Sequence, residues 1–198
     1  MKIVIATKNK GKILELRAAL AHLKAEIVSL AEFGDIGDAV EDGKTFAENA
    51  LIKAKYYMEK TGLPCIADDS GLEVAALNGE PGVYSARYAG IHANDTANNK
   101  KLVAELQKKN LTASAADYRC ALVFIDTDGK HILTEGSVDG TIKINPKGTN
   151  GFGYDPYFYT AEYAGRTMAE LTVAEKEKIS HRGKAVQKIV KCLEEYMK

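Results

Sequence analysis

Two acidic stretches of the sequence have the composition of a cation site. Asp68 and Asp69 follow a short apolar run, and Glu41 and Asp42 lie upstream in a stretch rich in glycine and aspartate. Adjacent carboxylates repel each other unless a cation offsets their charge, and Mg²⁺ takes one or two carboxylates together with phosphate oxygens and water. These four residues could therefore supply an oxygen shell for Mg²⁺. A turn capped by Asp69 is the alternative, because Asp-Ser-Gly is ordinary turn chemistry.

A basic loop, residues 7–12 with the sequence TKNKGK, follows the first apolar run. It places three lysines, a hydroxyl and an amide at the start of a predicted helix, where unpaired N–H groups and the helix dipole favour anions. The Walker A pattern is absent. We interpret the loop as a phosphate site, and a solvated turn with surface lysines is the alternative.

Two further segments contain groups suited to a planar base. The segment 151–156, GFGYDP, sets Phe152 and Tyr154 between glycines, so that a ring can stand against a base while Asp155 reads its edge. In the segment 180–183, SHRG, Arg182 can donate to a carbonyl oxygen. His181 taken alone is more typical of a structural histidine than of a binding residue.

Lys53 lies on the same stripe of a predicted helix as the apolar residues Phe46, Ala50 and Tyr57. Its ammonium could point into a cleft, or the stem could pack while the charge reaches water. The sequence suggests no serine or cysteine nucleophile paired with a histidine base. Direct attack by a metal-activated water is therefore the simplest mechanism.

Hydrophobic periodicity predicts the elements that position these groups. The predicted strands are 2–7, 25–30, 65–67, 118–126 and 131–138. The predicted helices are 45–61, 94–109 and 172–179, together with a first helix that follows Gly11 and a last helix that follows an interruption at 180–183. Thr45 and Glu48 form a capping box at the start of the long helix. Because strands and helices alternate early and a hairpin comes later, we expect an α/β fold with a mixed sheet flanked by helices.

Composition limits the class of protein. The 198 residues, 45% of them hydrophobic, fit one domain or two small lobes, and we expect a single domain over 1–198. With 27 basic and 27 acidic residues, no net field favours nucleic acid or a membrane. We see no signal peptide or spanning segment and expect a cytoplasmic protein. The three isolated cysteines predict neither disulfides nor zinc, and we expect them to be buried.

Six motifs, in order along the chain, strongly resemble the inosine triphosphate pyrophosphatase family, also called non-canonical purine NTP pyrophosphatases. They are Thr7-x-Asn9-x-x-Lys12, Thr45-Phe46-x-Glu48-Asn49-Ala50, Ala67-Asp68-Asp69-Ser70-Gly71-Leu72, Gly82-x-Tyr84-Ser85-Ala86-Arg87-Tyr88, Gly151-Phe152-Gly153-Tyr154-Asp155-Pro156 and Ser180-His181-Arg182. The resemblance implies an elongated mixed sheet with two lobes, a nucleotide cleft between them and a homodimer. It also implies Mg²⁺-dependent cleavage of ITP, dITP and XTP to the monophosphate and pyrophosphate, which removes them from the nucleotide pool.

The same resemblance assigns roles to individual residues. Glu41 and Asp69 would bind the metal, Asp69 would orient or deprotonate the attacking water, and Asp68 would support them. The triphosphate would be held by Thr7, Asn9, Lys12 and Lys53, the last of which we include with Asp68 and Asp69 in the catalytic set. Phe152 would stack on the purine and Ser70 would lie against the substrate. The base-recognition set comprises Phe152, Gly153, Tyr154, Asp155, Lys176, His181 and Arg182, of which Asp155, Lys176, His181 and Arg182 would read the six-position carbonyl and N1–H.

This base-reading set has a physical rationale. Adenine carries an amino group and a bare N1 where hypoxanthine and xanthine carry a carbonyl and an N–H. The donors of the protein would therefore face the amino group of adenine, which is itself a donor. Such a mismatch can favour ITP or XTP over ATP by roughly 10⁴-fold or more. How the two-amino group of GTP is rejected does not follow from the sequence.

One position departs from the family pattern, and two other classes of protein compete with this interpretation. The second position of the phosphate loop, often glycine in the family, is Lys8, which puts phosphate affinity or loop conformation in doubt. A Maf-like pyrophosphatase would lack the SHR and FGYD motifs. A nucleotide sensor or nucleic-acid-binding module would have no need of Glu41, Asp68 and Asp69, and the balanced charge opposes polyanion binding.

Overall fold

The computed structural model describes residues 1–91, 94–163 and 165–198 of the chain. The chain forms two compact units. Unit 1 comprises Met1–Asp69, Cys120–Glu135 and Lys184–Lys198, and unit 2 comprises Ser70–Arg119 and Gly136–Gly183. The candidate phosphate and metal residues therefore belong to unit 1, apart from Ser70, and the candidate base-recognition residues belong to unit 2.

Six strands form one sheet in the order β2-β1-β3-β4-β5-β6. Their bounds are β1 Lys2–Ile5, β2 Glu26–Ser29, β3 Cys65–Val74, β4 Ala113–Ile125, β5 His131–Lys143 and β6 Phe158–Thr160. β1 is parallel to β2 and β3, whereas β5 and β6 are antiparallel. The predicted α/β fold with a mixed sheet is confirmed.

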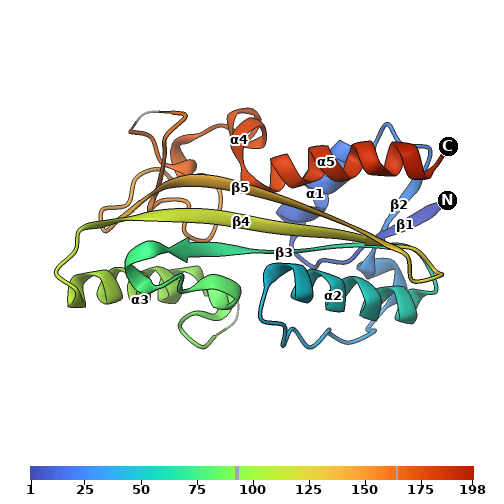
Figure 1. The fold of residues 1–198 in the computed structure, drawn as a ribbon, viewed down its shortest axis with the longest axis horizontal. Helices are drawn as coiled ribbons and strands as arrows, with labels where there is room; N and C mark the ends of the chain where they lie inside the picture. The colour runs from blue at the N-terminus through green and yellow to red at the C-terminus, as the bar shows by residue number, and fades with distance from the viewer. Residues whose placement is uncertain (92–93, 164) are drawn as a thin grey trace. The chain divides into compact units, whose positions relative to one another are not determined.

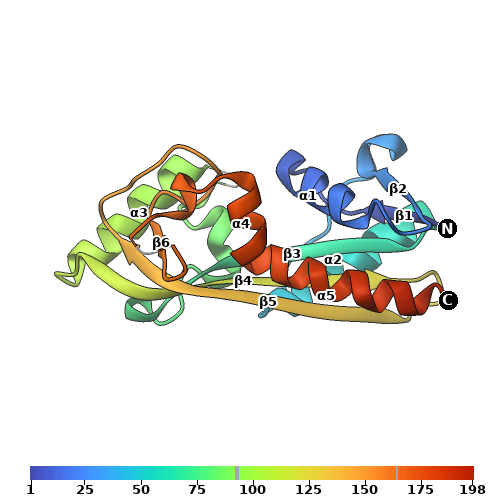
Figure 2. The ribbon, with the colours of Figure 1, turned by 90° about the horizontal axis from the view of Figure 1, so that it is seen from above.

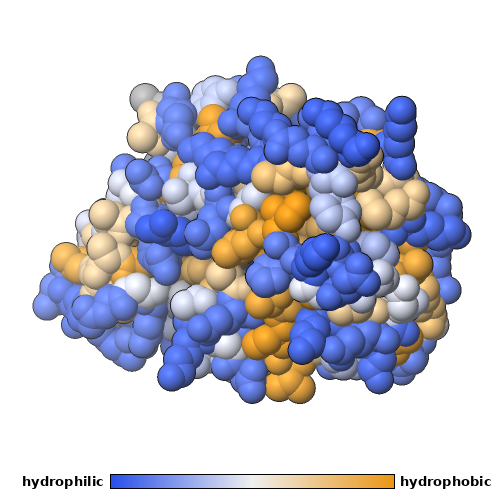
Figure 3. Space-filling view, turned by 45° about the vertical axis from the view of Figure 1, so that its right-hand side comes forward, coloured by the Kyte–Doolittle hydropathy of each residue, from blue (hydrophilic) through white to orange (hydrophobic). Residues whose placement is uncertain are grey.

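Five α-helices accompany the strands in the described residues: α1 Lys10–Leu20, α2 Phe46–Thr61, α3 Asp95–Lys108, α4 Val173–Ile179 and α5 His181–Tyr196. Four short 3-10 turns complete the elements: Leu30–Phe33, Ala75–Leu77, Gly82–Arg87 and Met168–Glu170. None of the helices described is long and apolar enough to cross a membrane. Figure 3 shows one face of the molecule, where hydrophilic residues predominate and apolar ones form patches between them.

In unit 1 the sheet is covered on both faces, and β1 shows how its sequence achieves this. Ile3 and Ile5 pack into a core with α1 and α5, while Val4 and Ala6 pack into a second core with α2. Successive side chains of a strand point to opposite faces, so an unbroken apolar run serves two cores. Figure 1 shows α1 and α5 on one side of the strands and α2 on the other.

The ends of α2 follow the local sequence chemistry. The Thr45 hydroxyl accepts from the N–H of Glu48, and the Glu48 carboxylate accepts from the N–H of Thr45, which is the predicted capping box. The helix ends at Thr61, and Gly62 follows it with a φ of 67°. Glycine adopts this left-handed conformation without steric strain.

Unit 2 has its own core. Leu102 and Leu106 of α3 pack with Tyr118 of β4 and Phe158 of β6. Figure 2 shows α3 and β6 from above. The loop 151–156 (the aromatic loop) and the helix α4 contact this core through Tyr154 and Ile179, which limits their freedom to move.

Some predicted boundaries were wrong. β3 does not end before Asp68 but continues to Val74, because Leu72 and Val74 are fully buried in the core of unit 2. His181 and Arg182 do not interrupt the last helices but open α5. Ser180 alone separates α4 from α5. It has an extended ψ of 149°, and its hydroxyl accepts from the N–H of Gly183. The short strand β6 was not predicted.

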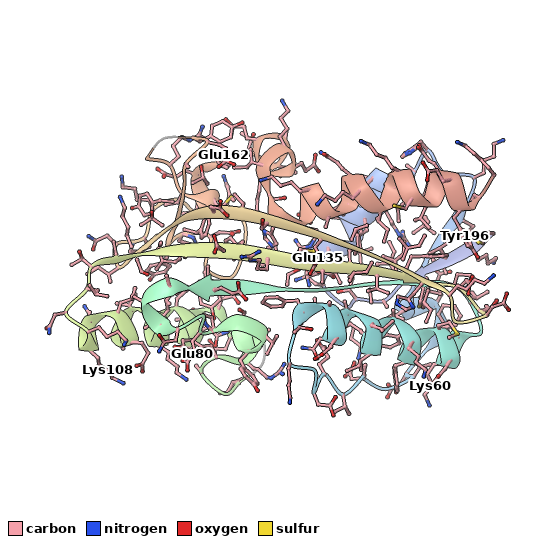
Figure 4. The ribbon with its side chains drawn as sticks, in the orientation of Figure 1. Lys60, Glu80, Lys108, Glu135, Glu162 and Tyr196 are labelled. Carbon is pink, nitrogen blue, oxygen red and sulfur yellow. The ribbon has the colours of Figure 1, made fainter. Side chains whose placement is uncertain are left out.

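The far end of α5 is tied to the turn between β4 and β5. The hydroxyl of Tyr196, labelled in Figure 4, donates to Oδ2 of Asp126 at 2.7 Å. The remaining oxygen of Asp126 accepts from the N–H groups of Asp128 and Lys130 at 2.9 Å each. The predicted hairpin is therefore confirmed, and the bonds of Asp126 fix its turn.

Candidate functional site

Lys53 is the centre of the acidic cluster in unit 1. Its Nζ lies 2.9 Å from Oε2 of Glu41 and 4.0 Å from Oδ1 of Asp69. It also donates to the main-chain oxygen of Asp68 at 3.1 Å. The side chain is only 14% exposed, so the ammonium lies among acceptors and does not reach out to water. The cluster brings the two predicted metal ligands to one point.

Lys12 forms the second ion pair of the cluster, at 2.7 Å from Oδ2 of the buried Asp68. The parallel register explains this contact, since Ile5 of β1 lies beside Ile66 of β3. Both the basic loop and Asp68 follow directly after these paired residues. The carboxyl edge of β1 therefore brings the predicted phosphate loop to the predicted acidic site, where α/β sheets place their ligands.

Asn49 is a residue of this site whose role the sequence analysis missed. Its side chain is fully buried, and its Nδ2 donates to Oδ2 of Asp69 at 3.2 Å. Its Oδ1 accepts from the N–H of Gly43 at 2.8 Å. One amide on α2 thus connects Asp69 to the loop that contains Glu41. A buried polar residue inside a quoted motif, on the apolar stripe of a helix, was the available signal.

Burial and charge act against each other in this cluster. Burial disfavours the charge of Lys53, but Asp69, Glu41 and Asp68 outweigh it and raise the pKa of the ammonium above 10.5. Burial also raises the pKa of Asp69 above 3.8, and repulsion from Glu41 adds to this, while Lys53, Asn49 and Lys12 oppose it. The carboxylate of Asp69 is therefore more basic than an ordinary aspartate, which suits a group that takes a proton.

The basic loop has a geometry that corrects one expectation. The N–H groups of Gly11 and Lys12 are not left unpaired, because Oδ1 of Asn9 accepts from them at 2.9 and 3.2 Å. Asn9 is therefore the N-cap of α1, and its own N–H donates to the Thr7 hydroxyl at 3.2 Å. Lys8 is exposed and pairs with Asp38 at 2.6 Å. The anion-binding capacity of the loop thus depends on its side chains.

The donor atoms of the cluster fit a hard divalent cation. Within the described residues, no three His, Cys, Asp or Glu side chains group as a ready metal site. Glu41 and Asp69, however, each offer a carboxylate oxygen within 4.0 Å of the Lys53 ammonium, a position already suited to positive charge. Two carboxylates are the number that Mg²⁺ takes when phosphate oxygens and water complete its shell.

Asp155 is the centre of the second cluster, which lies in unit 2. It is 3% exposed, and its Oδ2 accepts from Lys176 Nζ at 2.6 Å and from the N–H of Phe152 at 3.0 Å. Its Oδ1 accepts from the hydroxyl of Tyr118 at 3.3 Å. The structure thus joins Asp155 and Lys176, which are 21 residues apart in the sequence.

Phe152 is 40% exposed, a large fraction for a phenylalanine. Lys176 Nζ lies 4.8 Å from the ring centroid and Arg182 Cζ lies 5.8 Å from it. Both distances are within the range of cation–π attraction. An exposed aromatic face beside two cations is a surface on which a purine can stack and where its carbonyl oxygen would find donors.

His181 and Arg182 are buried at the first turn of α5. The imidazole of His181 stacks on Tyr118, with centroids 4.8 Å apart and planes inclined by 15°. Tyr118, which the sequence analysis did not single out, therefore contacts both His181 and Asp155. Burial raises the pKa of the Tyr118 hydroxyl well above 10, and Asp155 adds to the effect, so it acts as a neutral donor.

The other predicted substrate-binding residues of unit 2 are placed differently. Tyr154 is 4% exposed and its hydroxyl donates to the main-chain oxygen of Ser85 at 2.8 Å, so its ring belongs to the core. Gly153 is bound through its backbone to Asp95 and Asn99 of α3. Ser70 is partly buried in the middle of β3.

The predicted residues thus form two sets, one in each unit. The first comprises Lys12, Glu41, Lys53, Asp68 and Asp69, and the second comprises Phe152, Asp155, Lys176, His181 and Arg182. Asn49, Tyr118, Asp95 and Asn99 are contacts that the sequence analysis missed.

The chain is similar in sequence and in fold to known proteins. A family model described as the Ham1 family matches residues 3–192. The dITP/XTP pyrophosphatase of Geobacter sulfurreducens is 49% identical over 93% of this chain and 92% of its own length. That of Haemophilus influenzae is 50% identical over 93% and 95%. The solved HAM1 protein of Coxiella burnetii has a TM-score of 0.91 at 40% identity, covering 98% of this chain and 99% of its own. The Ham1 protein of Staphylococcus aureus has a TM-score of 0.88 at 39% identity, covering 99% and 100%.

Proposed function

The chain belongs to the Ham1 family, and on that premise we propose that it hydrolyses non-standard purine nucleoside triphosphates, ITP, dITP and XTP, to the monophosphate and pyrophosphate. Membership confirms the resemblance found in the six motifs. The structural observation that carries the proposal is the exposed ring of Phe152 beside Lys176 and Arg182.

Lys12 and Lys53 are the proposed ligands of the triphosphate, with Thr7 and Asn9 supplying a hydroxyl and an amide beside them. Each lysine is held by a carboxylate or a main-chain oxygen, so each is already oriented in a partly dehydrated environment. Oriented charges of this kind stabilise the charge that develops on phosphoryl oxygens, without reorganisation during the reaction.

Glu41 and Asp69 are the proposed ligands of Mg²⁺. When bound, the ion would offset phosphate charge and polarise a phosphoryl oxygen. Asp69 would also orient a water molecule in line with the α-phosphorus and take one of its protons on a carboxylate oxygen. The water oxygen then bonds to the α-phosphorus as the bridging P–O bond breaks, and pyrophosphate leaves with the electron pair. Asp68 supports this arrangement by holding Lys12.

Base selection is assigned to the second cluster. Phe152 would stack on the purine, and Lys176, Arg182 and His181 would meet its six-position carbonyl, while Asp155 would accept from N1–H. ATP lacks both of these features and would leave buried donors unsatisfied. The proposal therefore predicts a preference for ITP over ATP.

A product-resolved substrate panel tests the proposal. Purified protein with Mg²⁺ is incubated with ITP, dITP, XTP, GTP and ATP, and the products are separated by ion-exchange chromatography. We expect IMP and pyrophosphate from ITP and little turnover of ATP. Release of IDP and orthophosphate would contradict the bond specificity, and binding without turnover would favour a nucleotide sensor.

We further propose that the protein is a homodimer, as the motif resemblance implies. Light scattering coupled to size-exclusion chromatography measures the mass directly, for comparison with the 21.5 kDa of one chain. A mass of one chain at micromolar concentration would refute the dimer without affecting the proposed reaction.

A further inference from the structure

The helix α3 holds the backbone of Gly153 from outside the aromatic loop. The N–H of Gly153 donates to Oδ2 of Asp95 at 2.7 Å, and its carbonyl oxygen accepts from Nδ2 of Asn99 at 2.9 Å. Asp95 and Asn99 are four residues apart on α3, at the end opposite Lys108, which Figure 4 labels. Residues at this spacing share one face of a helix. One helix face therefore binds both main-chain groups of a single residue.

The peptide bond between Phe152 and Gly153 is fixed at both of its polar ends. Its N–H donates to Asp95, and its carbonyl oxygen accepts from the N–H of Asp155 at 3.3 Å. The N–H of Phe152 itself donates to the Asp155 carboxylate at 3.0 Å. The backbone of Phe152 is thus held on both sides, and its ring is free only about its own side-chain torsions.

The loop needs such contacts because its glycines are flexible. Gly151 and Gly153 have φ values of 78° and 62°, in the left-handed region that glycine enters readily. Glycine adopts many other conformations with similar ease, so these two residues do not by themselves fix the direction of the ring between them. The hydrogen bonds from α3 remove that freedom on the carboxyl side of Phe152.

We propose that Asp95 and Asn99 are positioning residues for base recognition, which act by holding Gly153 so that the Phe152 ring stays beside Lys176 and Arg182. The inference rests on the proposed function, in which Phe152 stacks on the purine. Hydrogen bonds to a carboxylate are among the stronger ones in proteins, so Asp95 contributes more than Asn99. The helix thereby acts on the affinity for the base through the backbone of Gly153.

Steady-state kinetics of matched variants test the inference. Asp95→Ala removes the acceptor, Asp95→Asn keeps an acceptor oxygen at the same length, and Asn99→Leu removes the amide at similar volume. Glu105→Gln and Gln107→Leu are the controls on the same helix, because Gln107 is exposed and the partly buried Glu105 pairs with Lys108, three residues away. Three quantities are measured: KM and kcat for ITP, the ITP-to-ATP ratio of kcat/KM, and the inhibition constant of pyrophosphate.

Asp95→Ala is expected to raise KM for ITP about tenfold with little change in kcat, as for the loss of one charge-assisted hydrogen bond that affects binding alone. The ITP-to-ATP ratio should fall, and the inhibition constant of pyrophosphate, which has no base, should stay at the wild-type value. Asp95→Asn should recover most of the loss, Asn99→Leu should show a smaller rise, and both controls should behave as wild type.

Two results would overturn the inference. One is a wild-type KM and substrate ratio in both Asp95→Ala and Asn99→Leu. The other is an equal loss of affinity for ITP and pyrophosphate, which would indicate a general structural role. If Asp95→Ala fails to fold, Asn99→Leu and Asp95→Asn decide the question by the same readouts. A wild-type protein that does not hydrolyse ITP would instead refute the proposed function, before any variant is compared.

Discussion

Asn49 donates to the carboxylate of Asp69 at 3.2 Å from a position with no exposed surface. Its other amide atom accepts from Gly43, so one side chain orients the proposed proton acceptor and anchors the acidic loop. Asn49→Ala leaves both partners without their bond and is expected to destabilise the fold by about 2 to 4 kcal/mol. Urea unfolding measures this change.

The variant Asn49→Asp separates the two contacts of the amide. It keeps an acceptor for Gly43 but places a carboxylate against Asp69, where like charges repel. We expect a loss of stability at least as large as in Asn49→Ala, because the new buried carboxylate has no added counter-charge, and a changed Mg²⁺ requirement, measured by calorimetric titration of Mg²⁺. Identical unfolding midpoints in Asn49→Ala and wild type would show that these hydrogen bonds contribute nothing.

Asp69→Asn is expected to lower kcat for ITP by about 10² to 10⁴, the usual contribution of a positioned proton acceptor. Nucleotide binding should persist, because Lys12 and Lys53 remain, and calorimetric titration with ITP measures it. Asp35→Asn is the matched control, since Asp35 lies in the exposed loop and accepts only a local bond from Gly37 among the contacts described. Wild-type turnover of Asp69→Asn would remove this residue from the mechanism.

Lys176→Met removes the cation between Asp155 and the Phe152 ring. The buried Asp155 then loses its counter-charge, and we expect a loss of about 3 to 5 kcal/mol in the free energy of unfolding. Adding Asp155→Asn should restore part of this stability but not the affinity for ITP. Lys178→Met, on the exposed side of α4, is the control for the charge change. Equal stability of the single and double variants would contradict a buried ion pair.

Glu175, in the capping box of α4, should make the free energy of unfolding depend on pH. Hydrogen bonds from Arg166 and from Thr172 lower its pKa from 4.5 to about 2. A depressed carboxylate pKa stabilises the fold above the unfolded value and loses this effect as pH falls. The unfolding midpoints of wild type and Glu175→Gln should therefore differ most above pH 4.5 and converge between 4.5 and about 2. A difference that is constant over this range would exclude the linkage.

Much of the fold could be predicted because local rules and packing agree. The capping box marked the start of α2, and the apolar runs 118–126 and 131–138 marked the strands of the β4–β5 hairpin. Only part of the strand β4 could be predicted. Its second half, 120–125, is continuously buried and apolar, whereas 113–117 has the weak pattern ASAAD and was not predicted as a strand. Ala116 packs into the core of unit 2, and the local sequence gives no signal of that long-range contact.

The site was predictable in its residue types and not in its contacts. Carboxylates, lysines and the flanked aromatic ring follow from the motifs, since each is chemically distinctive. Asn49 and Tyr118 act through partners 20 and 37 residues away, and no local pattern reports such pairings. At Asn9 the prediction was wrong for another reason. Its side chain caps α1 and accepts from the N–H groups of Gly11 and Lys12, which were expected to bind an anion.

The ion pairs of unit 1 imply thermodynamic linkage between anions and cations. Lys12 and Lys53 already contact Asp68 and Glu41, so a phosphate that engages either lysine competes with a carboxylate for it. A carboxylate relieved of its lysine becomes a better ligand for a positive ion. Phosphate and the cation should therefore each raise the affinity of the protein for the other by the same factor, because linkage between two binding sites is reciprocal.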